Sequence, residues 1–321
     1  MTSTIPSTSL VPRSRLHRAE HTLTVDAPAD VLYGLVADVT RWPAVFEPTV
    51  HVSHLERTAR AERFEIWAEV NGRVAHWTSR RVLDPVRRYV SFRQDHSTPP
   101  VTTMSGGWHF RELPDGATEI VLRHRFAVQD DDPEAVAAVT AALDRNGARE
   151  LAALARVAAG PYPVEDLVFS FSDRVELAGT AAEAYAFVDR ADRWPELLPH
   201  VSRVKLTEDE PHVQELEMDT VTADGSRHTT RSLRICRPER WIGYKQTETP
   251  DLMTGHSGVW RFEEGPSGAV ATATHVVVLA PDAIARVLGP DATPAEARAY
   301  VRDALGRNSR TTLERVAAVR G

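Results

Sequence analysis

The sequence predicts an α+β fold in which two tandem copies of one domain each wrap a curved antiparallel sheet around a long C-terminal helix and enclose an interior cavity. Short internal sequence repeats predict the duplication. TRWPAVFEP at 40–48 matches DRWPELLP at 192–199, and SGGWHF at 105–110 matches SGVWRF at 257–262, with the same offset in both pairs. The length of 321 residues, 42% of them hydrophobic, is sufficient for two packed cores.

These repeats divide the chain into four expected segments. Residues 1–16 are rich in Ser, Thr and Pro, lack an apolar run of signal-peptide length, and are expected to form a disordered lead. Residues 17–158 are the first predicted domain and residues 167–321 the second. Between them, AGPYPVED at 159–166 contains two prolines and a glycine and is typical of a linker.

Each copy is expected to begin with a strand and a helix. In the first copy, HTLTVDA at 21–27 is the predicted strand. The helix ADVLYGLVAD follows, opened by Pro28, because proline is tolerated in the first turn. This helix is expected to end before Trp42.

Several strands and then one long helix complete each copy. The clearest hairpin signals are two-residue pairs favoured in type I′ turns, Asn71-Gly72 and Asp224-Gly225. The closing helices are predicted over about 133–157 and 293–319, and they contain the related sequences LDRN and LGRN. Asp132 is expected to cap the first of them.

One predicted strand, HWTSRRVLDP at 76–85, places a charge in an apolar row. Successive strand side chains point to opposite faces, so Trp77, Ser79, Arg81 and Leu83 share one face. A buried guanidinium keeps its proton, and an unpaired buried charge is costly. The interior face must therefore either pair Arg81 with a carboxylate, such as Glu65 or Asp84, or be a wet cavity, and the residues alone leave both open.

The second copy repeats part of this strand. With one residue of slip, Ser232 corresponds to Ser79 and Arg234 to Arg81. Thr230 stands where the first copy has Trp77. The first copy is therefore expected to carry more of the chemistry.

Two histidines are candidates for proton transfer. His124 alternates with Leu122 and Phe126, and His275 alternates with Val277, so both are expected to face inward. An inward histidine can move protons because its pKa is near neutrality. The alternative is that each is a core residue whose hydrogen bonds are satisfied.

Further residues are candidates for holding a substrate. The tryptophans are expected to stack on a flat ligand or to belong to the core, and the asparagines to reach the cavity or to lie on a polar surface turn. The candidates are Trp67, Trp77, Trp108, its counterpart Trp260, Asn146 and Asn308.

Composition excludes several functional classes. A formal net charge of −7 argues against nucleic-acid and anionic-membrane partners, which are bound mainly through Lys and Arg. Cys236 is the only cysteine, which excludes an intrachain disulfide or a cysteine-based metal site and suits the cytoplasm. The sequence contains no apolar run long enough to span a membrane. It also lacks a Gly-rich phosphate loop, a His/Glu metal pattern and a nucleophile elbow, so we expect no metal and no cofactor.

The order of elements resembles the helix-grip fold of the START and Bet v 1 superfamily. The motifs RWP, W-T-S-R-R-x-L-D-P and L-x-R-N further resemble the didomain polyketide aromatase/cyclases of bacterial type II polyketide synthases. The resemblance implies that Arg81, and Arg234 as its counterpart, are central to cyclisation and aromatisation. A cavity tyrosine of single-domain members falls here on Thr49 and Val201, so a mechanism that needs this phenol is not expected.

The resemblance implies an enzyme that closes and dehydrates the first ring of a carrier-bound, ketoreduced poly-β-ketone. Such chemistry needs a base, an acid and a group that stabilises an enolate. Arg81 can supply only the last, which leaves Ser79, a histidine or water to move protons. The alternative is a non-catalytic carrier of a hydrophobic polyketide or lipid ligand, because fold alone does not decide activity.

The implied partners are an acyl carrier protein and the other components of a type II polyketide synthase. Carrier proteins are usually acidic and this chain is net negative, so docking needs a local basic patch. The candidate residues are Arg80, Arg87 and Arg88 in the first copy and Arg237 and Arg240 in the second. An ordinary solvated strand end is the alternative.

Overall fold

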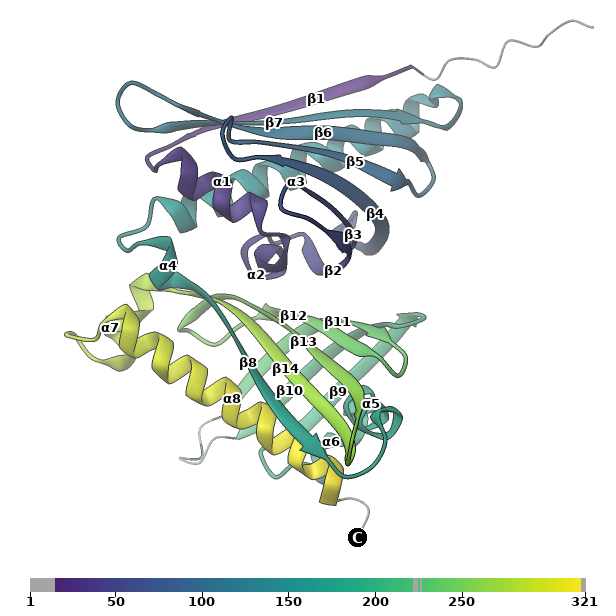
Figure 1. Cartoon of the computed structure of the whole chain (residues 1–321), viewed down its shortest axis with the longest axis vertical. Coiled ribbons are helices and arrows are strands. Elements are labelled where there is room, and N and C mark those ends of the chain that lie inside the picture. Colours follow the sequence, from purple (N-terminus) through teal and green to yellow (C-terminus); the bar gives the residue numbers. More distant parts are fainter. Residues whose placement is uncertain (1–14, 222–224, 226, 319–321) are drawn as a thin grey trace, which may run out of the picture.

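The computed structural model describes residues 15–221, 225 and 227–318. It confirms the α+β fold, with two antiparallel seven-stranded sheets that each accompany a long helix (Figure 1). The strand order is β1-β7-β6-β5-β4-β3-β2 in the first sheet and β8-β14-β13-β12-β11-β10-β9 in the second. Both sheets are open, because the strands at their two ends do not pair with each other. The repeated order supports the duplication.

The first sheet and its helices follow the predicted order of elements. They are β1 (His17–Val25), α1 (Ala29–Ala37), η1 (Val39–Arg41), α2 (Trp42–Val45), β2 (Thr49–Arg57), β3 (Ala61–Val70), β4 (Arg73–Asp84), β5 (Tyr89–His96), β6 (Val101–Glu112), β7 (Thr118–Val128), η2 (Gln129–Asp131) and α3 (Pro133–Ala158). The first strand begins earlier than predicted because residues from His17 onward pair with β7.

The second half repeats this order and adds one short helix before its sheet and one before its last helix. Its elements are α4 (Val164–Leu167), β8 (Val168–Leu177), α5 (Ala181–Asp189), η3 (Ala191–Arg193), α6 (Trp194–Leu197), β9 (Val201–Glu210), β10 (Val213–Val221), β11 (Arg227–Arg237), β12 (Trp241–Glu248), β13 (Met253–Gly265), β14 (Gly268–Leu279), α7 (Pro281–Leu288) and α8 (Pro294–Ala318). The division at 159–166 remains our proposal, supported by the repeated order.

Local sequence explains where α3 begins and which side it buries. The side chain of Asp132 accepts a hydrogen bond of 2.9 Å from the backbone N–H of Ala135, which is the predicted cap. Leu151, Leu154 and Val157 are buried at helical spacing. The helix therefore has a sharp start and an apolar stripe that faces the sheet.

The predicted turn at Asn71-Gly72 sets the pairing of β3 with β4. Asn71 has a φ of 53° and Gly72 a φ of 76°, as a type I′ turn requires. The two strands then pair from Val70 with Arg73 as far as Ala61 with Val82. The corresponding turn predicted at Asp224-Gly225 includes Asp224, which lies outside the described residues.

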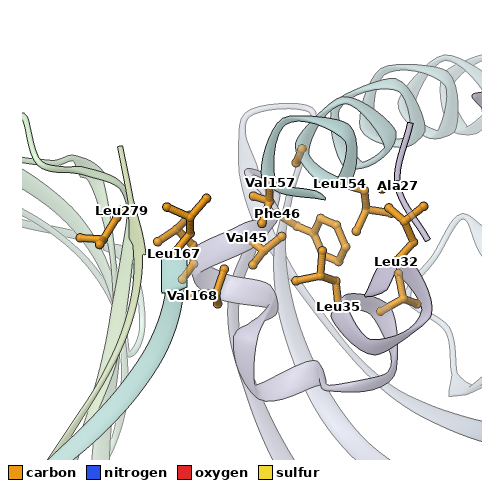
Figure 2. Close-up of a cluster of buried hydrophobic side chains, with 14 of the residues drawn as sticks. Ala27, Leu32, Leu35, Val45, Phe46, Leu154, Val157, Leu167, Val168 and Leu279 are labelled. Carbon is orange, nitrogen blue, oxygen red and sulfur yellow. The ribbon is translucent and has the colours of Figure 1, made fainter. Parts of the chain in front are cut away.

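A single hydrophobic cluster crosses the junction between the two halves. Figure 2 shows Leu167 and Val168 between Leu279 on one side and Val45 and Val157 on the other, and all five belong to the same buried cluster. The two halves thus share apolar packing in addition to the linker.

Residues 1–14 of the expected disordered lead lie outside the described part of the chain. Among the helices of the described residues, none is both long and apolar enough to cross a membrane.

Candidate active site

The first domain encloses a cavity of about 340 Å³ between its sheet and α3. The lining residues that are exposed to solvent are Asn71 at the β3–β4 turn, Thr98 to Pro100 in the β5–β6 loop, and Ala138 on α3. Buried side chains, including Phe64, Arg81 and Trp108, line the other end. The cavity therefore opens at the hairpin tips and ends among buried groups.

Arg81 lies at the deep end and is fully buried beside a carboxylate. Its Nε donates a hydrogen bond of 2.7 Å to Oε1 of Glu62, and its Nη2 contacts the same oxygen. Glu62 is also buried and lies directly opposite Arg81 in the β3–β4 register. The carboxylate partner is thus Glu62, and the expectation of Glu65 or Asp84 was wrong.

The guanidinium of Arg81 also caps α1. Nη1 donates to the carbonyl of Val36 at 2.8 Å, and Nη2 donates to the carbonyl of Ala37 at 2.7 Å. Arginine has five N–H donors, so these contacts use four and leave one Nη1 hydrogen on a residue that lines the cavity. Arg81 therefore holds β3, β4 and α1 together and has one donor to offer.

Ser79 and Trp77 share the cavity side of β4 with Arg81. All three line the cavity, as the strand alternation predicts. The hydroxyl of Ser79 is buried and makes only a long contact of 3.5 Å to the carbonyl of Arg93. It remains able to contact a ligand.

His124 reaches the cavity from β7 as a neutral imidazole. Burial, with a smaller contribution from the nearby ring of His21, lowers the pKa of His124 to about 4. Nδ1 of His124 has no hydrogen-bond partner in the described part of the protein. At pH 7 the ring is uncharged, and a neutral imidazole has one nitrogen that can accept a proton.

Glu150 on α3 is the functional candidate that the sequence interpretation missed. It lines the same cavity as His124, and burial raises the pKa of Glu150 to about 8. Desolvation is the cause of this shift, and no cation contributes to it. At pH 7 the carboxyl group of Glu150 is therefore mainly protonated and can donate a proton.

The remaining first-domain candidates divide between the cavity and the junction. Trp108 and Asn146 line the cavity, and Asn146 donates a hydrogen bond of 3.3 Å to the carbonyl of Glu69. Trp67 instead stacks on His76 at 4.4 Å and meets Trp241 of the second half edge-on. Placing Trp67 with the substrate-binding residues was therefore wrong.

The second domain keeps the arginine of this site without its carboxylate. Arg234 is buried and donates to the carbonyl of Val188 at 2.6 Å, as Arg81 does to α1. Gln214 lies opposite Arg234, where the first domain has Glu62. Ser232 is half-buried and pairs with Gln246 on β12.

A buried hydrogen-bond network occupies the interior of the second domain near His275. Nδ1 of His275 lies 2.9 Å from the Tyr244 hydroxyl and 3.1 Å from Nε2 of His256. Its Nε2 lies 2.9 Å from the hydroxyl of Ser309 on α8. His275 is therefore a satisfied core residue, the alternative left open by the sequence.

The other two second-domain candidates also lie away from a ligand cavity. Trp260 belongs to the buried core of this domain, together with Tyr185 and Phe262. Asn308 is exposed, and its carbonyl accepts a hydrogen bond from Thr312. The expectation that Asn308 reaches a cavity was wrong.

Lys245 of the second domain fixes one wall of the first-domain cavity. Its buried Nζ donates to three backbone carbonyls, those of Phe46 at 2.7 Å, Glu47 at 2.5 Å and Thr49 at 3.0 Å. Phe46 and Thr49 also line the cavity. Burial lowers the pKa of Lys245 to about 8, against the opposing effect of Glu69 and Glu47.

The two domains fit closely around this lysine. A Cβ atom on Gly243 would lie 2.4 Å from the ring of His51, so only glycine allows this approach. The His51 ring lies 4.6 Å from that of Trp241. The cavity wall that includes Thr49 is thus built partly by the second domain.

The predicted basic docking patch is not gathered on one surface. Arg88 pairs with Asp30 of α1, and Arg237 pairs with Glu65 across the domain junction. Arg87 and Arg240 are exposed turn residues, and Arg80 is on the outer face of β4. These five arginines do not form a continuous site at the cavity mouth.

Comparison with known protein families identifies both halves. Residues 17–159 and 177–299 each match a family described as polyketide cyclase/dehydrase and lipid transport.

Two curated relatives resemble the whole chain. The granaticin polyketide synthase bifunctional cyclase/dehydratase of Streptomyces violaceoruber is 65% identical over 308 residues, which cover 96% of this chain and 95% of that protein. The actinorhodin polyketide synthase bifunctional cyclase/dehydratase of Streptomyces coelicolor is 49% identical over 315 residues, covering 95% and 97%.

A solved structure agrees with the observed arrangement. The crystal structure of the di-domain ARO/CYC BexL from the BE-7585A biosynthetic pathway superposes with a TM-score of 0.79 at 48% identity. The match covers 94% of this chain and 98% of BexL.

Proposed function

This chain belongs to the polyketide cyclase/dehydrase family, and we propose that it closes and aromatises the first ring of a carrier-bound, ketoreduced poly-β-ketone inside its first domain. It is an enzyme of the bifunctional cyclase/dehydratase type, as its relatives over nearly the full length are. The observation that carries the proposal for the site is one cavity that contains a neutral imidazole, a protonated carboxyl group and a guanidinium donor.

Ring closure and dehydration need both a group that removes a proton and a group that donates one. A base removes a proton alpha to a carbonyl, and the resulting enolate forms a C–C bond to a second carbonyl carbon as that C=O π bond breaks. The alkoxide takes back the proton from the base and becomes a β-hydroxyl group. In the dehydration, a base removes the next alpha proton, the C=C bond forms and the C–O bond breaks. An acid protonates the departing oxygen, which leaves as water.

The environments of His124 and Glu150 assign these roles. Neutral His124 is the proposed base, because burial keeps its imidazole unprotonated at pH 7. Protonated Glu150 is the proposed acid for the departing hydroxyl group, because burial keeps its proton in place. Pairs of titratable groups whose environments reverse their usual order of pKa are a recurrent feature of acid–base sites.

Arg81 is the proposed stabiliser of the enolate oxygen. It has one Nη1 hydrogen beyond those used by Glu62, Val36 and Ala37, and it lines the cavity. A fixed N–H donor in a water-poor site stabilises developing negative charge more strongly than water does. Ser79 lies two residues away on the same face and can contact the same ligand.

The proposal includes delivery and location. The substrate arrives tethered to an acyl carrier protein, and the chain works with the other components of a type II polyketide synthase in the cytoplasm. The opening at Asn71 and the β5–β6 loop is the proposed entry for the tethered chain.

Reconstitution of the synthase with His124→Asn and Glu150→Gln variants tests the proposal. We expect both variants to remain folded and the yield of the first-ring aromatised product to fall about 10²-fold or more, as loss of a general acid or base does. The products are compared by liquid chromatography and mass spectrometry. Matched controls are His96→Asn and Glu263→Gln, which change exposed residues outside the cavity.

Two results would overturn the proposal. If the folded double variant gives the wild-type product at the wild-type rate, these residues do not perform the chemistry. If omission of the chain lowers the yield without changing the ring pattern, the protein acts as a carrier of the product.

A further inference from the structure

The outer face of the first sheet carries a row of arginines that the proposed catalysis does not use. Six neighbouring strands place their registered residues side by side. From β1 through β7, β6, β5 and β4 to β3, these residues are Arg18, Arg125, Ser105, Arg93, Arg80 and Arg63. We call this set the arginine row.

Strand alternation shows that the arginine row faces away from the cavity. Phe64, Arg81, Phe92, Met104 and His124 all line the cavity. Each is the direct chain neighbour of a member of the row, so the members point to the opposite side of the sheet. The arginines on β1, β4, β5 and β7 are exposed.

The row carries more positive charge than its neighbours neutralise. Asp95 pairs with both Arg63 and Arg80 at 2.7 and 2.6 Å. Among the described residues, no carboxylate forms an ion pair with Arg93 or Arg125. Two guanidinium groups near the centre of the sheet are therefore available to a partner.

A hollow of about 410 Å³ lies on this face, over the centre of the row. Arg80, Arg93 and Arg125 line it, together with Arg123 from the adjacent row. Arg123 pairs with Glu20 at 2.6 Å. The hollow gives an anionic side chain a recessed position among several guanidinium groups.

The dimensions of the row fit an α-helix laid across the strands. Strands are about 4.8 Å apart, so the five steps from β1 to β3 span about 24 Å. An α-helix advances about 5.4 Å per turn, so carboxylates at i, i+4 and i+7 on one face meet successive strands. A helix of about four turns covers the row.

We propose that the arginine row docks an acidic helix of the carrier protein that delivers the polyketide chain. This inference rests on the proposed function for the identity of the partner, and on charge complementarity for the site. Because the whole chain has a net charge of −7, an acidic partner is repelled except where local positive charge is concentrated.

The position of the row suits delivery into the cavity. Arg93 precedes Thr98 on the same strand and loop, and Thr98 lines the cavity at its exposed end. Five residues of extended chain span roughly 16 Å. A flexible arm that begins above the row can therefore pass around the β5–β6 loop into the opening.

Binding of the phosphopantetheinylated carrier protein to the full chain tests the proposal directly. Fluorescence anisotropy with labelled carrier is measured for the parent and for an Arg93→Glu/Arg125→Glu variant. We expect the dissociation constant to rise about tenfold or more, because two attractions become repulsions. The parent should also lose affinity steeply as salt is increased, and the variant much less.

The control variant Arg87→Glu/Arg240→Glu reverses two exposed arginines outside the row. It should bind the carrier like the parent. Turnover of a free thioester analogue should be unchanged in the Arg93→Glu/Arg125→Glu variant, while the KM for the carrier-bound chain rises.

Three outcomes would overturn the docking site. These are unchanged carrier binding in the row variant, an equal loss in the control variant, and a row that proves to hold a second copy of the chain in sedimentation experiments. Because binding is measured without turnover, a failed cyclase assay with intact carrier binding would count against the proposed function and support the docking site.

Discussion

Replacing Lys245 by methionine should destabilise the junction and loosen the cavity wall of the other domain. Nζ of Lys245 is the shared donor to the carbonyls of Phe46, Glu47 and Thr49. Methionine fills a similar volume but donates no hydrogen bond. The substitution therefore separates the lost donor from lost packing.

The expected change in the free energy of unfolding is the sum of two opposing contributions. A buried carbonyl that loses its donor costs roughly 1–3 kcal/mol, so three cost about 6 kcal/mol. Removing the buried ammonium relieves a penalty that corresponds to the lowering of its pKa from 10.5 to about 8, which is on the order of 3 kcal/mol. The net loss in the free energy of unfolding is about 2–3 kcal/mol.

The pH dependence gives a second readout. Between pH 8 and 10.5 the unfolded chain binds the proton of Lys245 more tightly than the folded protein does. Stability from this group therefore rises with pH across that window, by on the order of 3 kcal/mol, and this gain is lost as the pH falls from 10.5 to 8. The difference between the parent and Lys245→Met should widen accordingly.

Denaturant unfolding measures the loss of stability, and hydrogen exchange at the backbone N–H groups within residues 46–49, of which Pro48 has none, measures the loosening of the wall. Lys205→Met is the matched control, because Lys205 is exposed on β9. The reasoning is refuted if Lys245→Met unfolds at the same denaturant concentration as the control and leaves exchange at 46–49 unchanged.

Three more outcomes are expected. Glu150→Gln should lower the rate of first-ring formation about 10²-fold at pH 7 and remove the loss of activity near pH 8 that ionisation of Glu150 causes in the parent, as pH–rate profiles will show. Arg81→Ala should lower the unfolding free energy by about 3–5 kcal/mol, since it leaves buried Glu62 without its cation; a smaller change in urea titrations would argue against a tight pair. Asp132→Ala should cost about 1 kcal/mol through loss of the cap on α3, and an unchanged melting temperature would contradict the cap.

Much of the first-domain site could be predicted from strand periodicity. Alternation alone places Ser79 and Arg81 on the cavity side, and the same rule places His124 there. Glu62 was missed although a signal existed. A two-residue turn at Asn71-Gly72 fixes the β3–β4 register, and that register puts Glu62 opposite Arg81.

Glu150 was missed for a different reason. A glutamate on a long helix rich in Arg and Ala is usually a solvated surface charge. Its spacing from Leu143, Gly147 and Leu154 puts it on the buried stripe of α3, and that pattern could have identified it. The prediction that Asn308 faces inward was wrong, because the repeated L-x-R-N sequence preserves the helix but does not specify which of its residues contacts the sheet.

The domain junction left no periodic pattern in the sequence. Trp67 was assigned to the cavity because an aromatic residue on a strand suits either a core or a ligand. Its contact with Trp241 depends on how two separate sheets meet, which neither strand specifies by itself. The same holds for the three carbonyls that Lys245 joins.

The contact of Lys245 with the first domain also affects how the chain folds during synthesis on the ribosome. In the first sheet the first strand of the chain, β1, pairs with the last, β7, so the sheet is complete only after residue 128 has left the exit tunnel. Lys245 emerges more than a hundred residues later. Throughout that interval the carbonyls of Phe46, Glu47 and Thr49 must be hydrated by water. The nascent first domain therefore acquires its finished cavity wall only when β12 arrives, and a chain that terminates before residue 245 should fold with that wall still open to solvent.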